Sequence, residues 1–466
     1  MASTIGGILN TARTALLAQQ RATQVTAHNI SNATTEGYSR QRADMVAGTP
    51  ISTPFGPVGT GVHVVDVERA RDALLDRSFR RESSLASGHR MRYDLLGLVE
   101  TRFGEPGDYG LGAALDAFWS SWADLANDPT NTSARTAVQS RGRQLAEQLN
   151  GLAAGLDEVR DVATARLGGT VGRLNDLSSA VADLNRRIVA EEAGGHTASD
   201  LRDERDRILD EMATLVSIEV HERENGSVGV IAGGVGIVDG VRVSKLQAHF
   251  SGDDWSLRLE SGTTLDVRGG ELAGMLQVLN TDLPALEDRL DELARGIVHT
   301  VNDLHRTGTN PLGQTDVVFF DDQGGDLSLV TARNIALSDD VAADASSIAA
   351  GSGGAAGEYR SGASDIALAL AQLRDTPETD YLGGRTFGDF HANLVQDLGL
   401  SIRSTGDAAT VHETLAANAE ARRLSVSGVQ TDEELIRLMQ FQSAYTAAAR
   451  VVTAADEMLQ SLLNMV

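Results

Sequence analysis

The two ends of the chain are its most regular helical segments, and they constrain the fold more than any other feature. From Val429 to Val466 there is no glycine or proline, and apolar residues recur at alternating steps of three and four. This spacing predicts an amphipathic helix with a coiled-coil seam, because such residues share one helix face. The seam consists of Leu438, Phe441, Tyr445, Ala448, Val452, Ala455, Leu459, Leu462 and Val466.

A second, weaker seam runs through the N-terminal segment, where Ile8 to Glu36 is also free of glycine and proline. This seam consists of Ile5, Leu9, Ala12, Leu16, Gln19, Thr23, Thr26 and Ile30. Because it includes polar residues, we expect the N-terminal helix to be marginal when isolated. Chain ends are usually frayed and polar, so two amphipathic ends indicate pairing with each other or within an assembly.

Between these ends the sequence changes from helical to β-rich and back. Apolar periodicity predicts helices over 69–103, 111–126, 134–192, 200–215, 272–304 and 387–466, with a kink at 168–169 and breaks near Pro284 and Gly428. Short β-branched runs divided by glycine-rich turns over 216–267 predict a small antiparallel β domain. The stretch 49–61 is predicted as an extended loop, and 61–67 as a short strand.

A β-rich insertion in the middle of a helical rod returns both termini to the same end. We therefore predict a mainly α fold with an inserted β-rich domain: a discontinuous multi-domain rod whose N- and C-terminal helices pair as an antiparallel coiled coil. The length of 466 residues favours several domains over one core. The predicted domains are 1–36 with 430–466 (terminal coiled coil), 37–210 with 365–429 (helical rod) and 211–364 (β-rich insertion).

Composition excludes several classes of function. Acidic residues outnumber basic ones 65 to 40, and no block of five or more basic residues occurs, so we expect no nucleic-acid partner. The absence of cysteine excludes thiol catalysis, disulfides and cysteine-based zinc sites. No cleavable signal peptide and no run of about 18 apolar residues are present, so we expect no membrane insertion.

No catalytic signature stands out, and we predict neither an enzyme nor a cofactor or metal site. His412-Glu413 lacks a second histidine at metal-binding spacing, and Asp321-Asp322 reads as a solvated turn. Between Asp200 and Glu211, carboxylates alternate with Arg202, Arg205 and Arg207. That pattern predicts an ion-paired helix face rather than an acid–base pair.

The segment from Ala27 to Gln41 has an unusual local composition. Its residues of interest are Asn29, Ile30, Asn32, Thr34, Thr35, Gly37 and Tyr38. Gly37 is predicted to end the helix, because glycine readily adopts a positive φ. Asparagine and threonine are poor helix formers whose side chains bond to backbone groups, so their clustering here favours a specific polar role.

This segment resembles the Asn-Asn-Ile-Ala-Asn-x-x-Thr-x-Gly-Tyr/Phe signature of bacterial flagellar rod, hook and hook-associated proteins. His28 replaces the first Asn, Ser31 replaces Ala, and one residue separates Thr35 from Gly37. Residues 425–445, 200–206 and 269–274, with Val301-Asn302, extend the likeness over nearly the whole chain to the hook-associated protein 1 family (FlgK family) of hook–filament junction proteins. Larger relatives insert a further β domain after the position of Phe319-Phe320, where this chain has only a short turn.

The resemblance implies a structural, non-enzymatic role in a ring of about eleven subunits between hook and filament. The implied partners are the hook protein, a second junction protein (hook-associated protein 3) and a cytoplasmic export chaperone that binds the C-terminal helix. The resemblance also implies type III export without signal cleavage, and an extracellular location in the flagellum. In the assembled flagellum the terminal helices would be innermost and the β-rich domain outermost. The Ala27–Gln41 residues would then serve axial assembly, and the C-terminal seam core packing and chaperone binding.

Two other functions remain open on the sequence: another axial subunit, such as a hook or rod protein, or an enzyme domain carried on an axial scaffold. The long helical middle and the 425–434 segment favour the junction protein. We further expect both termini to be disordered in the free monomer and to order on assembly.

Overall fold

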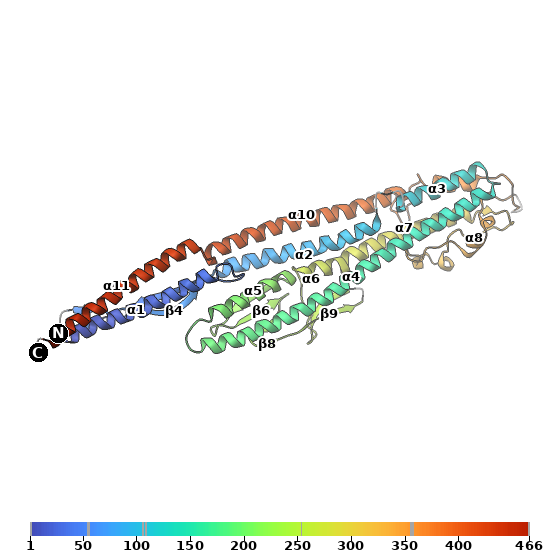
Figure 1. The fold of residues 1–466 in the computed structure, drawn as a ribbon. Coiled ribbons are helices and arrows are strands. Elements are labelled where there is room, and N and C mark those ends of the chain that lie inside the picture. Colours follow the sequence, from blue (N-terminus) through green and yellow to red (C-terminus); the bar gives the residue numbers. More distant parts are fainter. Residues whose placement is uncertain are drawn as a thin grey trace.

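A computed structural model describes residues 2–53, 56–104, 107, 110–252, 254–354 and 358–464, and shows a long, mainly helical rod (Figure 1). Within these ranges, the side chains of residues 2–4, 53 and 462 are not described. Of the predicted C-terminal seam, the side chain of Leu462 and all of Val466 therefore lie outside the described residues.

Helices account for most of the described chain. They are α1 (Ala2–Ser31), α2 (Ala73–Phe103), α3 (Leu111–Asn127), α4 (Thr132–Glu192), α5 (Ser199–Leu215), α6 (Glu271–Gln277), α7 (Leu283–His305), α8 (Asp339–Ala343), α9 (Asp365–Gln372), α10 (Phe387–Ser427) and α11 (Thr431–Leu463). A π-helical turn, η1 (Val278–Asp282), joins α6 to α7. Three short 3-10 turns follow, η2 (Gln323–Gly325), η3 (Leu327–Leu329) and η4 (Ala345–Ser347).

The strands are short, and every named pair is antiparallel. They are β1 (Gln41–Ala47), β2 (Ile51–Thr53), β3 (Gly56–Val58), β4 (Val62–Arg69), β5 (Ile218–Glu222), β6 (Val228–Ala232), β7 (Val235–Asp239), β8 (Arg242–Val243), β9 (Leu246–Ser251), β10 (Asp254–Leu259), β11 (Gly308–Thr309) and β12 (Gly351–Ser352).

The chain runs the length of the rod and returns, so that both termini lie at one end (Figure 1). There α1 and α11 lie side by side and run in opposite directions. Beyond them α2 packs along α10, and α4 forms the opposite side of the rod with α5, α6 and α7 between. The mainly α architecture with small β regions agrees with the predicted fold class.

The helix α4 forms the backbone of the rod interior. Apolar residues at helical spacing along it, including Leu145, Leu156, Leu167 and Leu174, are fully buried, because their stripe faces neighbouring helices over the whole length. The kink predicted at 168–169 does not interrupt this helix, which runs unbroken for 61 residues. Burial of the apolar residues on both sides of the glycine pair holds the helix in register.

The interruption predicted near Pro284 is also smaller than expected. The proline occupies the first turn of α7, where no backbone N–H is required from it. Only the π-helical turn η1 separates α7 from α6, so the segment continues as one helical column. This column lies within the predicted β-rich range 211–364 and packs against α2 and α4. The predicted domain bounds stay a prediction.

The larger part of the β structure lies in two separate regions, and the short β11–β12 pair lies apart from both. The sheet β5-β6-β7-β8 and the hairpin β9–β10 lie against α4 and α5, within the predicted range 216–267. A second region, the hairpin β1–β4, packs on α1. The stretch 49–61, predicted as loop, contains the small β2–β3 pair, so the loop prediction is wrong for that part.

The end of the rod opposite the termini is closed by an aromatic core. Phe118, Trp122, Phe319 and Phe320 are fully buried there, with ring centroids 4.9–6.2 Å apart in the contacting pairs. The ring of His305 joins this cluster, 5.7 Å from Phe319. This packing fixes the loops after α7 to the helices α3 and α4.

Candidate functional site

The Ala27–Gln41 segment lies where the terminal helices meet the rod. The helix α1 ends at Ser31, and the side-chain amide of Asn32 donates to the carbonyl of His28 at 3.1 Å. Gly37 has a φ of +80°, but the helix ends six residues before it, so the prediction that Gly37 ends the helix is wrong and its positive φ belongs to the turn that follows. The chain then turns back through Tyr38 and Ser39 into β1.

Asn29 joins three elements at this turn. Its amide Nδ2 donates to the carbonyl of Gln41 at 2.8 Å and to the Glu434 carboxylate on α11 at 3.0 Å. Its Oδ1 accepts from the backbone N–H of Gln41 at 2.9 Å and from the Tyr38 hydroxyl at 2.8 Å. Asn29 and Glu434 are each 1% exposed. The helix α1, the strand β1 and the helix α11 are therefore held together by one fully bonded buried amide.

Tyr38 supports this arrangement from the outside. Its hydroxyl also lies 3.0 Å from Nδ1 of His28. Burial, followed by the negative charges of Asp200, Asp203 and Glu434, raises the pKa of Tyr38 well above its usual range. The phenol therefore stays protonated and keeps its hydrogen bond to Asn29 at any physiological pH.

The remaining residues of the motif are less enclosed. Ile30 and Asn32 are half-buried, whereas Thr34, Thr35 and Gly37 are exposed. The structure thus brings Asn29, Tyr38 and Glu434 together and leaves the two threonines at the surface. Glu434 was not singled out by sequence reasoning, because its partner lies 405 positions away in the chain.

The C-terminal seam faces α1 only in part. Ala455 is fully buried, and Leu438, Phe441, Val452 and Leu459 are half-buried. Tyr445, a predicted seam residue, is 44% exposed. On the α1 side, Ala12, Ala18, Ala22 and Val25 are buried, because α1 packs against both α11 and the β1–β4 hairpin.

A second apolar face of α11 is uncovered. At 100° per residue, Ile436 and Met439 lie opposite the seam, whereas Leu435 and Val451 lie on its two flanks. It consists of Leu435, Ile436, Met439, Val451 and Met458, each at least 44% exposed. One side chain of this size at the surface is ordinary, but several exposed on one helix indicate an interaction surface.

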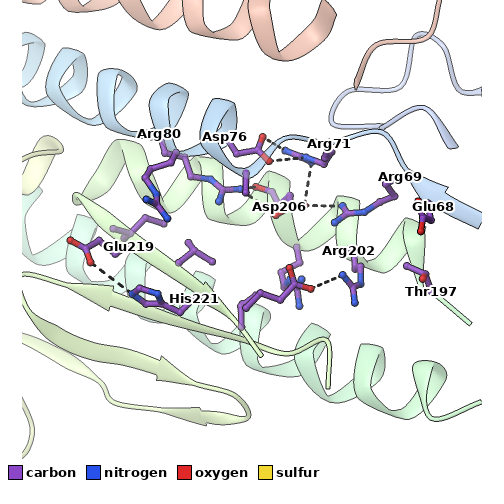
Figure 2. Close-up of a pocket in the computed structure, with 17 residues that line it drawn as sticks. Glu68, Arg69, Arg71, Asp76, Arg80, Thr197, Arg202, Asp206, Glu219 and His221 are labelled. Carbon is purple, nitrogen blue, oxygen red and sulfur yellow. Dashed lines mark hydrogen bonds and ion pairs between the residues drawn. The ribbon is translucent and has the colours of Figure 1, made fainter. Parts of the chain in front are cut away.

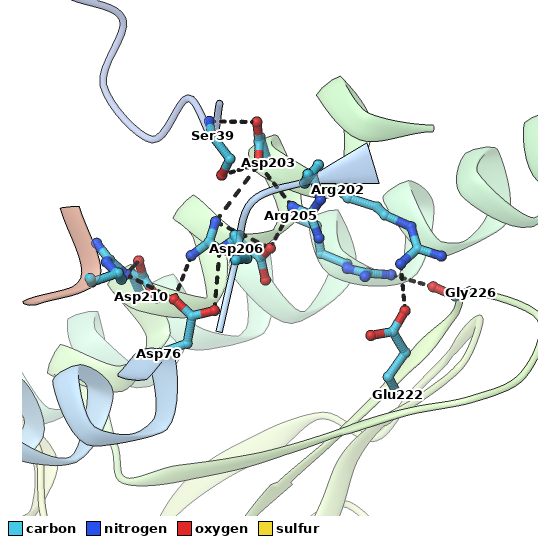
Figure 3. Close-up of polar contacts among 12 residues, drawn as sticks. Ser39, Asp76, Arg202, Asp203, Arg205, Asp206, Asp210, Glu222 and Gly226 are labelled. Carbon is cyan, nitrogen blue, oxygen red and sulfur yellow. Dashed lines mark hydrogen bonds and ion pairs between the residues drawn. The ribbon is translucent and has the colours of Figure 1, made fainter. Parts of the chain in front are cut away.

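A buried network of charges forms the joint between the terminal helices and the rod (Figure 3). We call it the joint network. It consists of Ser39, Arg69, Arg71, Asp76, Arg80, Asp203, Asp206, Asp210 and Arg423. These residues come from the segment before β1, from β4 and its end, and from α2, α5 and α10, so the network ties together five parts of the chain.

The contacts of this network are short and numerous. Asp203 accepts from the backbone and hydroxyl of Ser39 at 2.8 and 2.7 Å. Asp206 pairs with Arg69 at 2.8 Å, and Figure 2 shows Arg71 lying between Asp206 and Asp76. Asp210 pairs with Arg80 at 2.6 Å and with Arg423 at 2.5 Å.

The network differs from the sequence prediction in its partners. The helix α5 was expected to pair its carboxylates with its own arginines, but Asp203, Asp206 and Asp210 pair with arginines of other elements. Arg202 pairs instead with Glu192 and Glu222, and Arg205 bonds to the carbonyl of Gly226. The aspartates, spaced three and four apart, share the face of α5 that packs against the rod.

Electrostatics at the joint follow from this pairing. Burial alone would raise the pKa of Asp206, but the guanidinium groups of Arg71, Arg69 and Arg80 outweigh it and hold the pKa well below its usual range. For Asp203 burial dominates and raises the pKa, despite Arg69 and Ser39. Burial also lowers the pKa of Arg205 to about 10. The aspartates and arginines of the joint network therefore stabilise one another by ion pairing, as expected of a structural joint.

A polar cavity of about 610 Å³ adjoins the network between β4, α2, α5 and β5 (Figure 2). Its walls carry both signs of charge, including Arg69, Arg80, Glu219 and Glu222. Among the described residues, no group of three or more His, Asp or Glu side chains is arranged to hold a metal ion. In the same ranges, no helix combines the length and apolarity needed to cross a membrane.

Comparisons with known proteins assign this geometry to a family. Residues 96–320 match the family profile described as flagellar hook-associated protein FlgK helical domain. Residues 420–465 match the C-terminal profile of flagellar basal body rod FlgEFG proteins, and residues 9–38 match that of flagella basal body rod proteins. The two terminal profiles cover most of α11 and of α1.

Full-length relatives agree with these profiles. The chain is 30% identical to flagellar hook-associated protein 1 of Bacillus subtilis (strain 168), covering 100% of this chain and 99% of the relative. It is 23% identical to the Escherichia coli (strain K12) protein of the same name, covering 99% and 100%.

A solved structure has the same fold. The flagellar hook junction protein FlgK from Burkholderia pseudomallei aligns with a TM-score of 0.65 at 15% identity, covering 75% of this chain and 100% of that one. Given 30% identity along essentially the full length of a relative, the chain belongs to the flagellar hook-associated protein 1 family.

Proposed function

We propose that this chain is a structural subunit of the bacterial flagellum at the junction between hook and filament, needed for filament assembly and motility. The observation that carries the proposal is the alignment with hook-associated protein 1 from end to end, including both terminal helices. The terminal profiles are shared with rod proteins, so they support a place in the flagellar axis. The helical-domain match over 96–320 favours the junction over a hook or rod subunit.

The helix α11 is covered by α1 on one side and exposed on the other, and this difference suggests how the terminal helices assemble. We propose that α1 and α11 pair as an antiparallel coiled coil and that the second face of α11 packs against neighbouring subunits in the inner core of the axis. In support, α11 has apolar residues on two faces, and α1 covers only one of them. Burying the second face against another copy would remove about 25 cal/mol of unfavourable free energy per Å² of apolar surface.

Partners and location are proposed on the same basis. The subunits form a ring of about eleven copies that contacts the hook protein on one side and hook-associated protein 3 on the other. A cytoplasmic chaperone holds the exposed apolar face of α11 before export, since that face is otherwise open to water. Export proceeds without a cleaved signal peptide, and the assembled protein is extracellular.

We also propose that the motif residues act in assembly through the shape of the joint. Asn29 and Tyr38 fix the angle between the α1–α11 pair and the rod, and the exposed Thr34 and Thr35 are available to a neighbouring subunit. The seam residues Leu438, Phe441, Val452 and Leu459 hold α11 on α1.

A deletion strain complemented with variants tests this function. Cells lacking the gene should carry hooks without filaments in electron micrographs and shed flagellin into the medium. Leu459→Asp should fail to restore filaments, because a carboxylate in the seam blocks helix pairing. Gln460→Asp, at the exposed neighbouring position, should restore them. Normal filaments in the deletion strain would contradict the proposal.

A further inference from the structure

An aromatic pair stands out at the surface of the β9–β10 hairpin. Phe250 and Trp255 face each other across the two strands with ring centroids 5.1 Å apart. Phe250 is 54% exposed, whereas Trp119, Phe319 and Phe320 are at most 2% exposed. Asp254, beside Trp255, is exposed and forms no ion pair within the described ranges. The hairpin therefore presents an aromatic surface with an adjacent carboxylate.

A groove of about 690 Å³ crosses the α2–α10 pair on the other side of the rod. Gly399 of α10 lines it at an open point, Gly406 lies beneath the Tyr93 ring, and Leu400 is a further apolar lining residue. Gly406 is required by this packing, because a Cβ there would lie 2.9 Å from the Tyr93 ring. At Gly399 a Cβ would meet nothing within 4 Å, so the groove is open at that point.

The rim of the groove carries an uncommitted cation. Arg403 is exposed and pairs with no acidic group that the structure describes. Arg90, at the same rim, already bonds Glu413 and lies over the ring of Tyr93. A planar guanidinium beside an aromatic wall is suited to an incoming aromatic ring accompanied by a carboxylate.

The hairpin lies beside α4, on the side of the rod opposite the α2–α10 pair (Figure 1). Asn280 of η1 holds both backbone polar groups of Trp255, each at 2.8 Å. Two residues further, Asp282 pairs with Arg92 of α2, which also donates to Ser401 of α10. A chain of hydrogen bonds and one ion pair therefore connects Trp255, through η1 and α2, to the helix α10 that lines the groove.

We propose that the β9–β10 hairpin of one copy docks into the α2–α10 groove of the next copy. Phe250 and Trp255 lie over Gly399 and against Tyr93, and Asp254 pairs with Arg403. Two different patches on opposite sides of a subunit form a head-to-tail contact, the type that generates rings and helical assemblies. This contact rests on the proposed junction function and specifies a lateral surface outside the terminal helices.

Charge reversal tests the pairing in complemented deletion cells. Asp254→Arg and Arg403→Asp should each reduce the fraction of hooks carrying filaments about tenfold or more, because each sets like charges against each other. The double variant should restore it, since the charges are again opposite. Val241→Asp, at an exposed apolar position of the same β region, should have no effect. Unimpaired single variants, or a double variant no better than either single one, would overturn the contact.

Crosslinking gives a second readout that is independent of motility. The chain contains no cysteine, so Ser251→Cys with Thr410→Cys introduces the only thiols. A flexible bismaleimide added to isolated hook–filament complexes should give a ladder of multiples of 49.2 kDa. Ser251→Cys with Thr136→Cys, a position on α4, should give none. Absence of the ladder, or linkage to a protein of another mass, would overturn the contact.

The two proposals fail in distinguishable ways. Antibody labelling that finds the protein away from the hook–filament junction would contradict the proposed function. Labelling at the junction with normal filaments, but with no ladder, would contradict only the hairpin–groove contact.

Discussion

At the scale of single residues, Asp206 is the centre of the joint. It is paired with arginines from β4 and its end and from α2, and its carboxylate is almost fully enclosed. Removing one member of a buried set of charges is costly, because the remaining charges are less well compensated. The residue is therefore a sensitive probe of whether the joint is structural.

Asp206→Asn should lower the free energy of unfolding by about 3 kcal/mol, since three buried guanidinium groups lose the carboxylate that they share, although each keeps at least one other aspartate. Urea denaturation followed by circular dichroism measures this loss. Glu204→Gln, on the exposed side of the same helix, should change it by about 0.5 kcal/mol or less. Equal effects of the two substitutions would show that the network does not hold the joint.

His305 is a second informative residue, in the aromatic core at the far end of the rod. It is fully buried, its Nδ1 lies 2.7 Å from the carbonyl of Val317, and its Nε2 accepts from the N–H of Ala349 at 2.9 Å. Nδ1 must therefore carry the proton of a neutral ring. Burial lowers the pKa of His305 to about 4, from 6.5 in the unfolded chain.

This shift predicts a loss of stability in mild acid. The unfolded chain binds the proton more strongly, so the stabilising contribution is complete above pH 6.5 and is lost as pH falls towards 4, by about 3 kcal/mol in all. Urea titrations followed by tryptophan fluorescence report on this core, because Trp119 and Trp122 are buried there and the Trp122 ring is 6.2 Å from His305. His305→Gln should flatten the pH dependence relative to the wild type, and His221→Gln, at an exposed position, should not. If the free energy of unfolding of His305→Gln depended on pH as steeply as that of the wild type, another group would be responsible for the pH dependence.

At the scale of elements, the long helices owe their stability to packing, and their glycines show where that packing is closest. On α4, a Cβ at Gly142 would lie 2.7 Å from the ring of Phe319, and one at Gly151 would meet nothing within 4 Å. The two positions are alike in sequence terms and opposite in surroundings.

Gly151→Ala should raise stability by about 0.5–1 kcal/mol, because alanine is the better helix former. Gly142→Ala should lower it, since displacing the Phe319 ring in the core costs about 1–3 kcal/mol and exceeds the gain in helix propensity. Thermal denaturation of both variants measures the difference. A Gly142→Ala variant more stable than the wild type would mean that the aromatic core around Phe319 accommodates an added methyl group without strain.

At the scale of the whole molecule, the rod and the terminal pair differ in how completely they are buried. Leu149 and Leu174 of α4 are fully buried, whereas α11 leaves one apolar face open and contacts the chain on the other. Partial burial gives little free energy to offset the entropy of ordering two long helices. The terminal pair is therefore the part of the molecule most dependent on neighbouring copies.

Hydrogen exchange of the free monomer tests this dependence. The amides of Leu16 and Leu459 should exchange orders of magnitude faster than those of Leu149 and Leu174, and should become protected in isolated hook–filament complexes. Strong protection at Leu16 or Leu459 in the monomer would contradict assembly-coupled ordering. Protection of the rod amides in the same sample is the internal control.

The sequence by itself determined the helices, the return of the chain and the family. Helical periodicity is a local property, so it located α2 through α5 and α10 to within a few residues. The Ala27–Gln41 and 425–445 segments carried the resemblance that the full-length comparison confirms. The same local signal overestimated the interruption near Pro284, because a proline in the first turn of a helix costs no hydrogen bond.

Only the tertiary structure decided which groups meet. Asn29 and Glu434 are 405 positions apart, and Arg69 and Asp203 are 134 apart, so no spacing rule could pair them. The sequence predicted that the charges of α5 are ion-paired, but it could not predict which distant arginines the aspartates meet. Long-range pairing depends on how the whole chain folds back, which also places the α2–α10 groove and the β9–β10 hairpin on opposite sides of the rod.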